Sequence, residues 1–459
     1  MKSGLAIATF ACLLASGAAQ ARPSASDAAL AKDVLKRSIS MRTVAGQGQV
    51  PALAAYYAGV LKDAGFADGD IEITPMGETA TLAVTLKGRD PKLKPIALLG
   101  HMDVVEAKAA DWDRDPFVPV EENGYIFGRG SEDNKYDIAM MVAALARLKR
   151  EGYAPRRSII LLLSGDEETA MVTTRALASK YRGVEMVLNG DGGGGTLGED
   201  GKANYYALQA GEKTYADFTI EYTNPGGHSS RPGKLNAIYQ LAGALERIGA
   251  YRFPAQSNEL TRAALSIAAT KVSPDLADAM RRFVKDPNDQ QAAATIASDP
   301  EYVGQVGTTC VTTMVNGGHA QNALPQRAVA NVNCRIFPGV SVESVRETIV
   351  RVINDPSATV KVDGDPVASD ASPLRPDLMK AVTRAVQTRY PGVPVIPAMS
   401  AGATDSVHFR ALGVPSYGVA SLFSKPSDSY AHGLNERVPV AGIGDAVGQW
   451  YDVLKSVAS

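Results

Sequence analysis

Cysteine, tryptophan and histidine are scarce in this chain, which has 459 residues but only three, two and five of them, respectively. One cysteine lies in an apolar run at the N-terminus, which leaves Cys310 and Cys334 for the rest of the chain. Two thiols cannot complete a four-coordinate zinc site by themselves. Both lie in segments with strand-like sequences, so they could pair as a disulfide or remain two separate buried thiols.

The chain also lacks an excess of charge of either sign. Its 47 Lys and Arg residues nearly balance its 49 Asp and Glu residues, and the two kinds are interspersed. Because proteins that bind nucleic acids usually carry a basic patch, we expect no nucleic-acid partner. Beyond the N-terminus the sequence has no apolar run long enough to cross a bilayer, so we expect no membrane partner either.

The one long apolar run, "LAIATFACLLASGAA", lies between Lys2 and the small residues "AQA" at 19–21. A basic start, an apolar centre and a small-x-small end are typical of a secretory signal peptide. We therefore predict that residues 1–21 are a signal peptide and that the mature protein is exported, to a periplasm or out of the cell. The alternative is a buried helix at the N-terminus.

Hydrophobic patterns predict an α/β fold with an insertion. Strand-like runs alternate with amphipathic helical segments up to about residue 210 and again from about 367, which is typical of a mixed sheet covered by helices on both faces. Between them, 211–366 has the pattern of a β-α-β-β-α-β unit, a ferredoxin-like α+β sandwich, with an Ala-rich helical insertion at 251–306. We predict a three-layer domain in two parts, 22–210 and 367–459, interrupted by this smaller domain.

The stretch "SIILLLSGDEETA" (158–170) runs from a predicted buried strand directly into three carboxylates. Desolvated carboxylates repel each other unless a cation offsets their charge. Other metal-binding side chains follow other predicted strands or precede a helix, and such connections gather at the carboxyl edge of a sheet. The candidates are His101 and Asp103 in "GHMD", Asp133 in "GRGSEDNK", Glu167 and Glu168 in "SGDEE", Asp191 in "NGDGGGG" and His432 in "YAHGLNERV".

Two imidazoles with several carboxylates suit a pair of divalent ions bridged by one carboxylate, most simply Zn²⁺, with Co²⁺ or Mn²⁺ as alternatives. Two such ions would turn a bridging water into a hydroxide near neutral pH and polarise a carbonyl group. Glu167 and Glu168 are neighbours on an extended segment, so their side chains diverge. One can bind metal while the other acts as a general base, an arrangement suited to amide hydrolysis.

The segments "GHMDVV", "GRGSEDNK", "SGDEE", "NGD" and "AHGLNERV" resemble those of the M20 family of metallopeptidases, which includes carboxypeptidases, dipeptidases and aminoacylases. The resemblance covers the chain from about residue 45 onward. It implies that the three-layer domain is catalytic and that the inserted domain is a lid through which relatives often dimerise. The enlarged lid of this chain could instead close over its own site, so both a monomer and a lid-mediated homodimer remain open.

The resemblance assigns the candidates to roles. It implies that one ion takes His101 and Asp191, that the other takes Glu168 and His432, and that Asp133 bridges the two ions.

Two further roles in this domain follow from the same resemblance. Asp103 would orient the imidazole of His101, the usual task of a carboxylate behind a metal-bound histidine. Glu167 would be the general base. Relatives also have a cis peptide bond after the bridging aspartate, so we expect one between Asp133 and Asn134.

The lid would contribute three residues to substrate binding. His228 in "GGHSS" would polarise the scissile carbonyl once the lid closes. Asn322 and Arg335 would grip the terminal carboxylate of the substrate, for which the planar fork of arginine is suited. Asp405 keeps the "TD" motif of the family, which helps to hold substrate, but Val407 replaces the arginine that many relatives have two positions later. Carboxylate recognition would then depend more on Arg335.

These observations predict an exported two-zinc hydrolase that cleaves a peptide or N-acyl amide bond next to a terminal carboxylate, as carboxypeptidases and dipeptidases do. Its substrate would be a small peptide or an N-acyl amino acid. One alternative is an amidohydrolase of lipophilic N-acyl amino acids, which the "TDSVHF" and "DPF" segments resemble. Another is a non-catalytic periplasmic protein that binds metal or peptide, although a binder would have no use for the free base Glu167.

Overall fold

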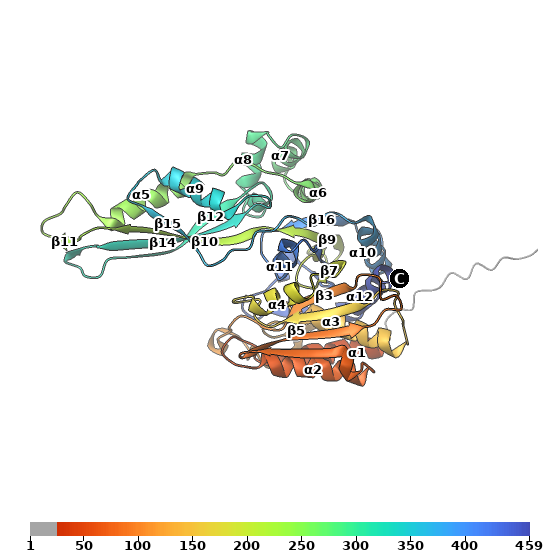
Figure 1. The fold of residues 1–459 in the computed structure, drawn as a ribbon. Helices are drawn as coiled ribbons and strands as arrows, with labels where there is room; N and C mark the ends of the chain where they lie inside the picture. Colours follow the sequence, from red (N-terminus) through yellow and green to blue (C-terminus); the bar gives the residue numbers. More distant parts are fainter. Residues whose placement is uncertain (1–24) are drawn as a thin grey trace, which may run out of the picture.

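The computed structural model of the chain describes residues 25–459, and the predicted signal peptide lies outside them (Figure 1). The predicted α/β fold is confirmed: a large mixed sheet with helices on both faces forms the body, and a smaller α+β arm projects from it. Among the described helices, none has the length and apolar character needed to cross a bilayer.

The sheet of the body has ten strands, in the order β1-β2-β6-β3-β7-β17-β9-β8-β18, with β16 also paired to β9. The central strands β6, β3, β7 and β17 run parallel to one another, so their carboxyl ends lie along the same edge. The strands are β1 (Ile71–Met76), β2 (Thr79–Leu86), β3 (Ile96–His101), β6 (Ile159–Ser164), β7 (Met186–Asn189), β8 (Gly194–Leu197), β9 (Ala203–Glu212), β16 (Val395–Ser400), β17 (Ser416–Gly418) and β18 (Phe423–Ser424).

Both faces of the central strands are buried, because successive side chains of a strand point to opposite sides and both sides are apolar here. In β3, Leu98 packs into the core under one helix layer and Leu99 into the core under the other. The first layer holds α1 (Ala25–Ile39), α2 (Val50–Asp63), α3 (Lys135–Arg150), α10 (Pro376–Arg389) and α12 (Ile443–Val457), and the second holds α4 (Val172–Lys180) and α11 (Ser406–Ala411).

The arm consists of a four-stranded antiparallel sheet, in the order β12-β14-β10-β15, with α5 and α9 on one face. Alternate residues of β10, such as Phe218 and Ile220, are buried under these helices, while those between them form a polar open face. A two-stranded ribbon, β11 with β13, lies at the far end of the arm (Figure 1). The elements are α5 (Ala237–Ala250), α9 (Val342–Ile353), β10 (Thr214–Thr223), β11 (Gly227–His228), β12 (Thr309–Gly317), β13 (Ala323–Leu324), β14 (Arg327–Ile336) and β15 (Thr359–Asp363).

Cys310 on β12 pairs directly with Cys334 on β14, and the two form a disulfide. Of the two alternatives left open by the sequence, the structure therefore shows the bridged one.

The helical insertion contains α6 (Glu259–Ala268), α7 (Pro274–Lys285) and α8 (Gln290–Ala297), which share a small core of their own around Phe283. An Asn258 capping box starts α6, which packs against β16 of the body. Figure 1 shows the insertion above the place where the arm meets the body. It therefore braces the junction between the two parts.

A second small sheet was not anticipated from the sequence. It contains β4 (Val120–Glu122), β5 (Tyr125–Phe127) and β19 (Arg437–Pro439), in the order β19-β5-β4. Strand β5 precedes the loop with Asp133, and β19 follows the loop with His432. The small sheet thus brings together two loops that are distant in the sequence.

Candidate metal centre

The carboxyl edge of the large sheet carries the predicted metal ligands. His101 ends β3, Glu167 and Glu168 follow β6, and Asp191 follows β7. The loop before α3 adds Asp133, and the loop before β19 adds His432. All six side chains meet at one place, as the convergence of parallel strand ends predicts.

The side chains form three overlapping sets of three, and two of these sets share the carboxylate of Asp133. In each set the ligand atoms lie within 4.8 Å of one another. Asp133 belongs to two of them: its Oδ1 lies 2.8 Å from His101 Nε2 and its Oδ2 lies 3.2 Å from His432 Nε2. The two sets that share Asp133 are His101, Asp133 and Asp191, and Asp133, Glu168 and His432; the third set is His101, Glu167 and Glu168. The first two match the two ligand groups and the bridging aspartate that the resemblance implies, and the expected cis peptide bond after Asp133 is present.

The imidazole of His101 is oriented by Asp103. Its Nδ1 lies 3.1 Å from the backbone oxygen of Asp103 and 3.6 Å from the Oδ1 atom of the same residue. Because a carbonyl oxygen can only accept, Nδ1 carries the hydrogen, which leaves the lone pair of Nε2 for a cation. That nitrogen faces Asp133 and lies 3.9 Å from Asp191 Oδ2.

The carboxylate of Asp103 has a second task. It accepts hydrogen bonds from the backbone amides of Glu167, at 3.1 Å, and Glu168, at 3.0 Å. The same buried residue therefore fixes a metal-binding imidazole and the segment that carries the predicted base. The preceding residue, Asp166, is not a ligand: its carboxylate accepts hydrogen bonds from the amides of Val172 and Thr173 at the start of α4.

The electrostatics of the cluster favour cations. Burial, reinforced by neighbouring carboxylates, raises the pKa of Glu167 and Asp191 well above the usual range. Hydrogen bonds to Asp133 and Glu168 raise the pKa of His432 to about 10. Burial opposes the charge of His101, but its hydrogen bonds to Asp103 and Asp133 still raise its pKa well above the usual range. A bound cation would therefore stabilise the clustered carboxylates. A donor set of nitrogen and oxygen atoms of this kind fits divalent ions such as Zn²⁺.

Glu167 is buried beside the cluster, with 8% of its surface exposed. Its carboxylate lies close to His101 and Glu168, yet within residues 25–459 it accepts no hydrogen bond. It also belongs to neither of the two sets that share Asp133. The position leaves its oxygens available to a water or substrate atom at the cluster.

The arm is the part of the structure that the sequence predicts to be a lid. The three residues predicted to act from it do not belong to this cluster, and they lie in two separate places. His228 is exposed in β11 at the tip of the arm, with Nδ1 accepting a hydrogen bond from the Ser230 amide at 3.1 Å. Asn322 lies beside it, since its carbonyl accepts a hydrogen bond from the Ser229 amide at 2.9 Å. Arg335 lies near the opposite end of β14, where it stacks on the ring of Tyr215 at 4.7 Å.

This placement corrects one prediction. From Arg327, where β14 begins near the tip, to Arg335 the strand rises by about 26 Å at about 3.3 Å per residue. Asn322 and Arg335 therefore do not grip the same carboxylate within one chain. Spacing along the sequence did not show this, because it does not give the direction in which an extended strand carries its residues.

Asp405, which the sequence predicts to bind substrate, lies beside the end of β6. It is 1% exposed, and its two oxygens accept hydrogen bonds from Ser164 Oγ, at 2.5 Å, and from Thr174 Oγ1. Both carboxylate oxygens are thus engaged by hydroxyl groups inside the protein, and the side chain supports the end of β6, from which Glu167 follows.

Sequence reasoning missed two charged residues beside the ligands. Arg129 and Glu436 form a buried ion pair, with Arg129 Nη1 2.6 Å from Glu436 Oε2. Both lie in the segments "GRGSEDNK" and "AHGLNERV", which also carry Asp133 and His432. The signal that could have found them is a pair of opposite charges in two loops that each carry a metal ligand.

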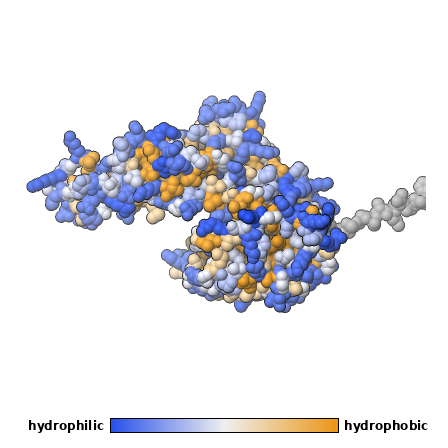
Figure 2. Space-filling view, in the orientation of Figure 1, coloured by the Kyte–Doolittle hydropathy of each residue, from blue (hydrophilic) through white to orange (hydrophobic). Residues whose placement is uncertain are grey.

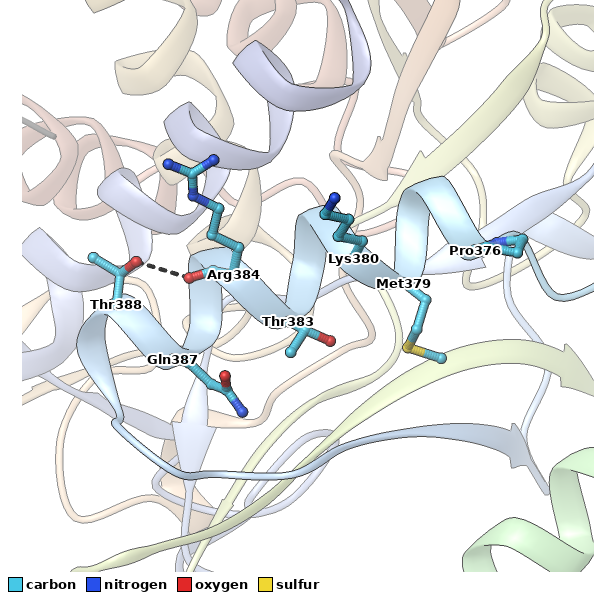
Figure 3. Close-up of a pocket in the computed structure, with 7 residues that line it drawn as sticks. All are labelled: Pro376, Met379, Lys380, Thr383, Arg384, Gln387 and Thr388. Carbon is cyan, nitrogen blue, oxygen red and sulfur yellow. Dashed lines mark hydrogen bonds between the residues drawn. The ribbon is translucent and has the colours of Figure 1, made fainter. Parts of the chain in front are cut away.

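A hollow on the surface runs along α10 and is separate from the cluster (Figure 3). Its lining comes from this one helix and contains none of the predicted site residues. Within it, Thr388 Oγ1 donates a hydrogen bond to the carbonyl of Arg384 at 2.7 Å, an ordinary contact within a helix. It carries no group suited to hydrolysis.

Comparison with known proteins shows the family of this chain. The family model for peptidase family M20/M25/M40 matches residues 97–456, and the chain belongs to this family. It is a hydrolase of the M20 type.

Individual relatives are named either as N-fatty-acyl-amino acid synthase/hydrolases or as carboxypeptidases. The chain is 30% identical over 387 residues to the N-fatty-acyl-amino acid synthase/hydrolase PM20D1.1 of Danio rerio, a match that spans 81% of this chain and 74% of the relative. It is 26% identical over 396 residues to the probable carboxypeptidase S-like 2 of Dictyostelium discoideum, spanning 82% and 74% of the two chains. In structure it is similar to the M20 family metallo-carboxypeptidase Sso-CP2 from Sulfolobus solfataricus, with a TM-score of 0.71, 18% identity, and 93% and 98% of the two chains covered. At 18% identity, the similarity to Sso-CP2 shows a shared fold alone.

Proposed function

We propose that the protein is a two-metal amidohydrolase that cleaves the amide bond of an N-acyl amino acid or a small peptide next to a terminal carboxylate. The observation that carries the proposal is the pair of ligand sets joined by Asp133, with the carboxylate of Glu167 buried beside them and within 4.8 Å of ligand atoms of His101 and Glu168. A protein that only binds metal or peptide would not need a carboxylate held in this position.

The chain's own residues have distinct tasks. His101, Asp133, Asp191, Glu168 and His432 would hold two divalent ions, which when bound supply Lewis-acid polarisation and acidify water. Glu167 accepts a proton from the attacking water and passes it to the leaving amine. Burial, which raises its pKa, suits a base that must also act as an acid near neutral pH. Asp103 fixes the positions of Glu167 and His101 relative to each other.

Two features support a substrate with a carboxylate and an acyl group. Arg335 is only partly buried and lies on the open face of the lid sheet, where its guanidinium could meet a carboxylate once the lid moves. The relative from Danio rerio is named for N-fatty-acyl-amino acids, and its identity to this chain is higher than that of the carboxypeptidase S-like relative. We therefore place N-acyl amino acids first and C-terminal peptide bonds second.

Export is part of the proposal. The N-terminal sequence has the pattern of a signal peptide, and the Cys310–Cys334 disulfide suits an oxidising compartment such as a periplasm or the medium.

For assembly, we propose a homodimer formed through the lid. Strand β12 is the edge of the lid sheet and exposes Val311, Met314 and Val315, each with at least 60% of its surface accessible. Figure 2 shows apolar residues gathered over this part of the arm. Exposed apolar edge strands tend to pair with another chain, and the sheet could continue into a second copy. Size-exclusion chromatography with light scattering would give about twice the chain mass; a monomer at micromolar concentration would contradict this part.

A substrate panel on zinc-loaded protein tests the activity. It should contain a long-chain N-acyl amino acid, a short N-acyl amino acid and a dipeptide, each also with its carboxylate converted to an amide. We expect hydrolysis of free acids, with the long-chain N-acyl compound turned over best and the amides much more slowly. Hydrolysis of none of the free acids would contradict the proposed function, and equal rates on acids and amides would contradict carboxylate recognition.

A further inference from the structure

The carboxylate of Glu436 is fully buried and holds the loop that carries the bridging aspartate. Its Oε1 accepts hydrogen bonds from the backbone amides of Glu132, at 2.7 Å, and Asp133, at 3.1 Å. Its Oε2 accepts a third from the amide of Gly130, at 3.0 Å, and a fourth from Arg129. Three of these four donors belong to the backbone of one short loop, so the carboxylate fixes the path of that loop.

The partner of this carboxylate extends the contact to the second loop. While Nη1 of Arg129 binds Glu436, its Nη2 donates to the carbonyls of His432, at 3.3 Å, and Gly433, at 3.2 Å. The guanidinium is itself buried and lies over the ring of Trp112 at 5.2 Å. Arg129 therefore ties the backbone of the His432 loop to the carboxylate that holds the Asp133 loop.

These two loops need such a support more than the other ligands do. His101 is the last residue of a central strand, and Glu168 and Asp191 closely follow two others, so the sheet positions them. Asp133 and His432 lie in loops, and His432 adopts a left-handed backbone conformation with φ of 61°. A non-glycine residue is strained there and remains only where its surroundings hold it.

We propose that Glu436 and Arg129 are positioning residues for the metal centre: as one buried pair they hold Asp133 and His432 in the geometry that lets Asp133 face both ligand sets. The inference rests on the proposed two-metal function. Neither residue touches the ligand atoms, so the pair acts on the ions through the two loops. Charge-assisted hydrogen bonds to backbone amides and carbonyls suit this task, because they are stronger than neutral ones and fix direction as well as distance.

The test is the affinity for Zn²⁺ alone, measured by competition with a chromophoric chelator, and not the activity. In Glu436→Gln the side chain keeps its size but can no longer accept all four hydrogen bonds. We expect at least one of the two ions to bind about 10- to 100-fold more weakly, the range found for groups that orient metal ligands. The matched control is Asp452→Asn, which breaks the buried ion pair between Asp452 and Arg389 on α12 and α10 at 2.8 Å, remote from every predicted ligand in the sequence. It should bind both ions as the unmodified protein does.

A second variant covers the case in which Glu436→Gln does not fold. Arg129→Lys keeps the charge but loses the fork that reaches both Glu436 and the carbonyl of His432, and it should also weaken zinc binding. Folded variants that bind two zinc ions with unchanged affinity would overturn the inference while leaving the proposed function intact. Failure of both variants to fold would also overturn it, because the pair would then be a requirement of the fold. Unmodified protein that binds no zinc would overturn the proposed function itself.

Discussion

Glu168 and His432 are 264 residues apart in the sequence, yet Glu168 Oε1 lies 2.9 Å from His432 Nε2. One follows a central strand of the large sheet and the other lies in a loop near the end of the chain. With Asp133 they form one of the two ligand sets, and this set has the more exposed of the two imidazoles. The ion held there should therefore be lost more easily.

Replacing His432 with alanine should remove one of the two ions and leave the other. The set of His101, Asp133 and Asp191 stays complete in this variant. We expect metal analysis after dialysis to give about one zinc per chain instead of two, with little hydrolysis remaining. His319→Ala is the matched control, because His319 is exposed on the lid and belongs to no ligand set. Two tightly bound ions in His432→Ala would show that His432 is not a ligand.

Glu167→Gln should keep both ions and lose turnover. The amide has nearly the same shape as the carboxylate but cannot take a proton, and general acid–base catalysis typically contributes about 10²- to 10⁴-fold. We expect kcat to fall by about that factor, while zinc content and the thermal midpoint stay near those of the unmodified protein. Glu168→Gln provides the contrast, since it should lose metal as well. A Glu167→Gln variant with unchanged kcat would exclude Glu167 as the base.

Asp103→Asn should weaken metal binding and slow turnover at once. The carboxylate of Asp103 accepts two backbone hydrogen bonds from the Glu167–Glu168 segment, and the amide nitrogen of asparagine would face one of those donors. We expect zinc affinity to fall by about 10- to 100-fold and kcat to stay reduced even at saturating zinc. If saturating zinc fully restores kcat, Asp103 acts only through the metal and not on Glu167.

His408 should contribute to the pH dependence of the free energy of unfolding and should have no effect on metal binding. Burial, with the charge of Arg175 adding to it, lowers the pKa of His408 to about 4. Between pH 6.5 and about 4 the unfolded chain therefore binds one more proton at this residue than the folded chain does. The contribution to the free energy of unfolding is complete above pH 6.5 and decreases as the pH falls toward 4.

His408→Asn removes the imidazole that titrates. The free energy of unfolding should therefore fall less between pH 7 and pH 4.5 than in the unmodified protein. Chemical denaturation at a series of pH values measures the slope. An unchanged slope would show that His408 titrates alike in both states, and a loss of zinc would show that it is a ligand after all.

The sequence predicted the parts of the site that depend on the sheet. Parallel strands end at one edge, so His101, Glu167 and Asp191 could be placed together from three apolar runs and the polar residues after them. Asp133 and His432 lie in loops; the sequence offered them as candidates, but only the resemblance to a family assigned their roles. Helix α1 and strands β9 and β16 were not predicted either, and β16 contains Pro397, which usually argues against a strand.

Three lid and loop residues show where the pattern was insufficient. Asn322 and Arg335 were predicted to act together, but an extended strand separates them. Asp405 keeps a family motif, yet its position in the fold buries it under Ser164 and Thr174. In each case the motif gave the residue type, while its function depends on packing that distant segments determine. Glu436 was missed for the same reason, because its four hydrogen bonds join two loops about 300 residues apart.

The most direct test of the central claim is hydrolysis of an N-acyl amino acid before chelation, after removal of metal with a strong chelator, and after return of zinc, with metal content measured at each step. The structure predicts that activity is lost on chelation and returns as two zinc ions per chain are restored. Hydrolysis that continues in protein free of metal would contradict the account.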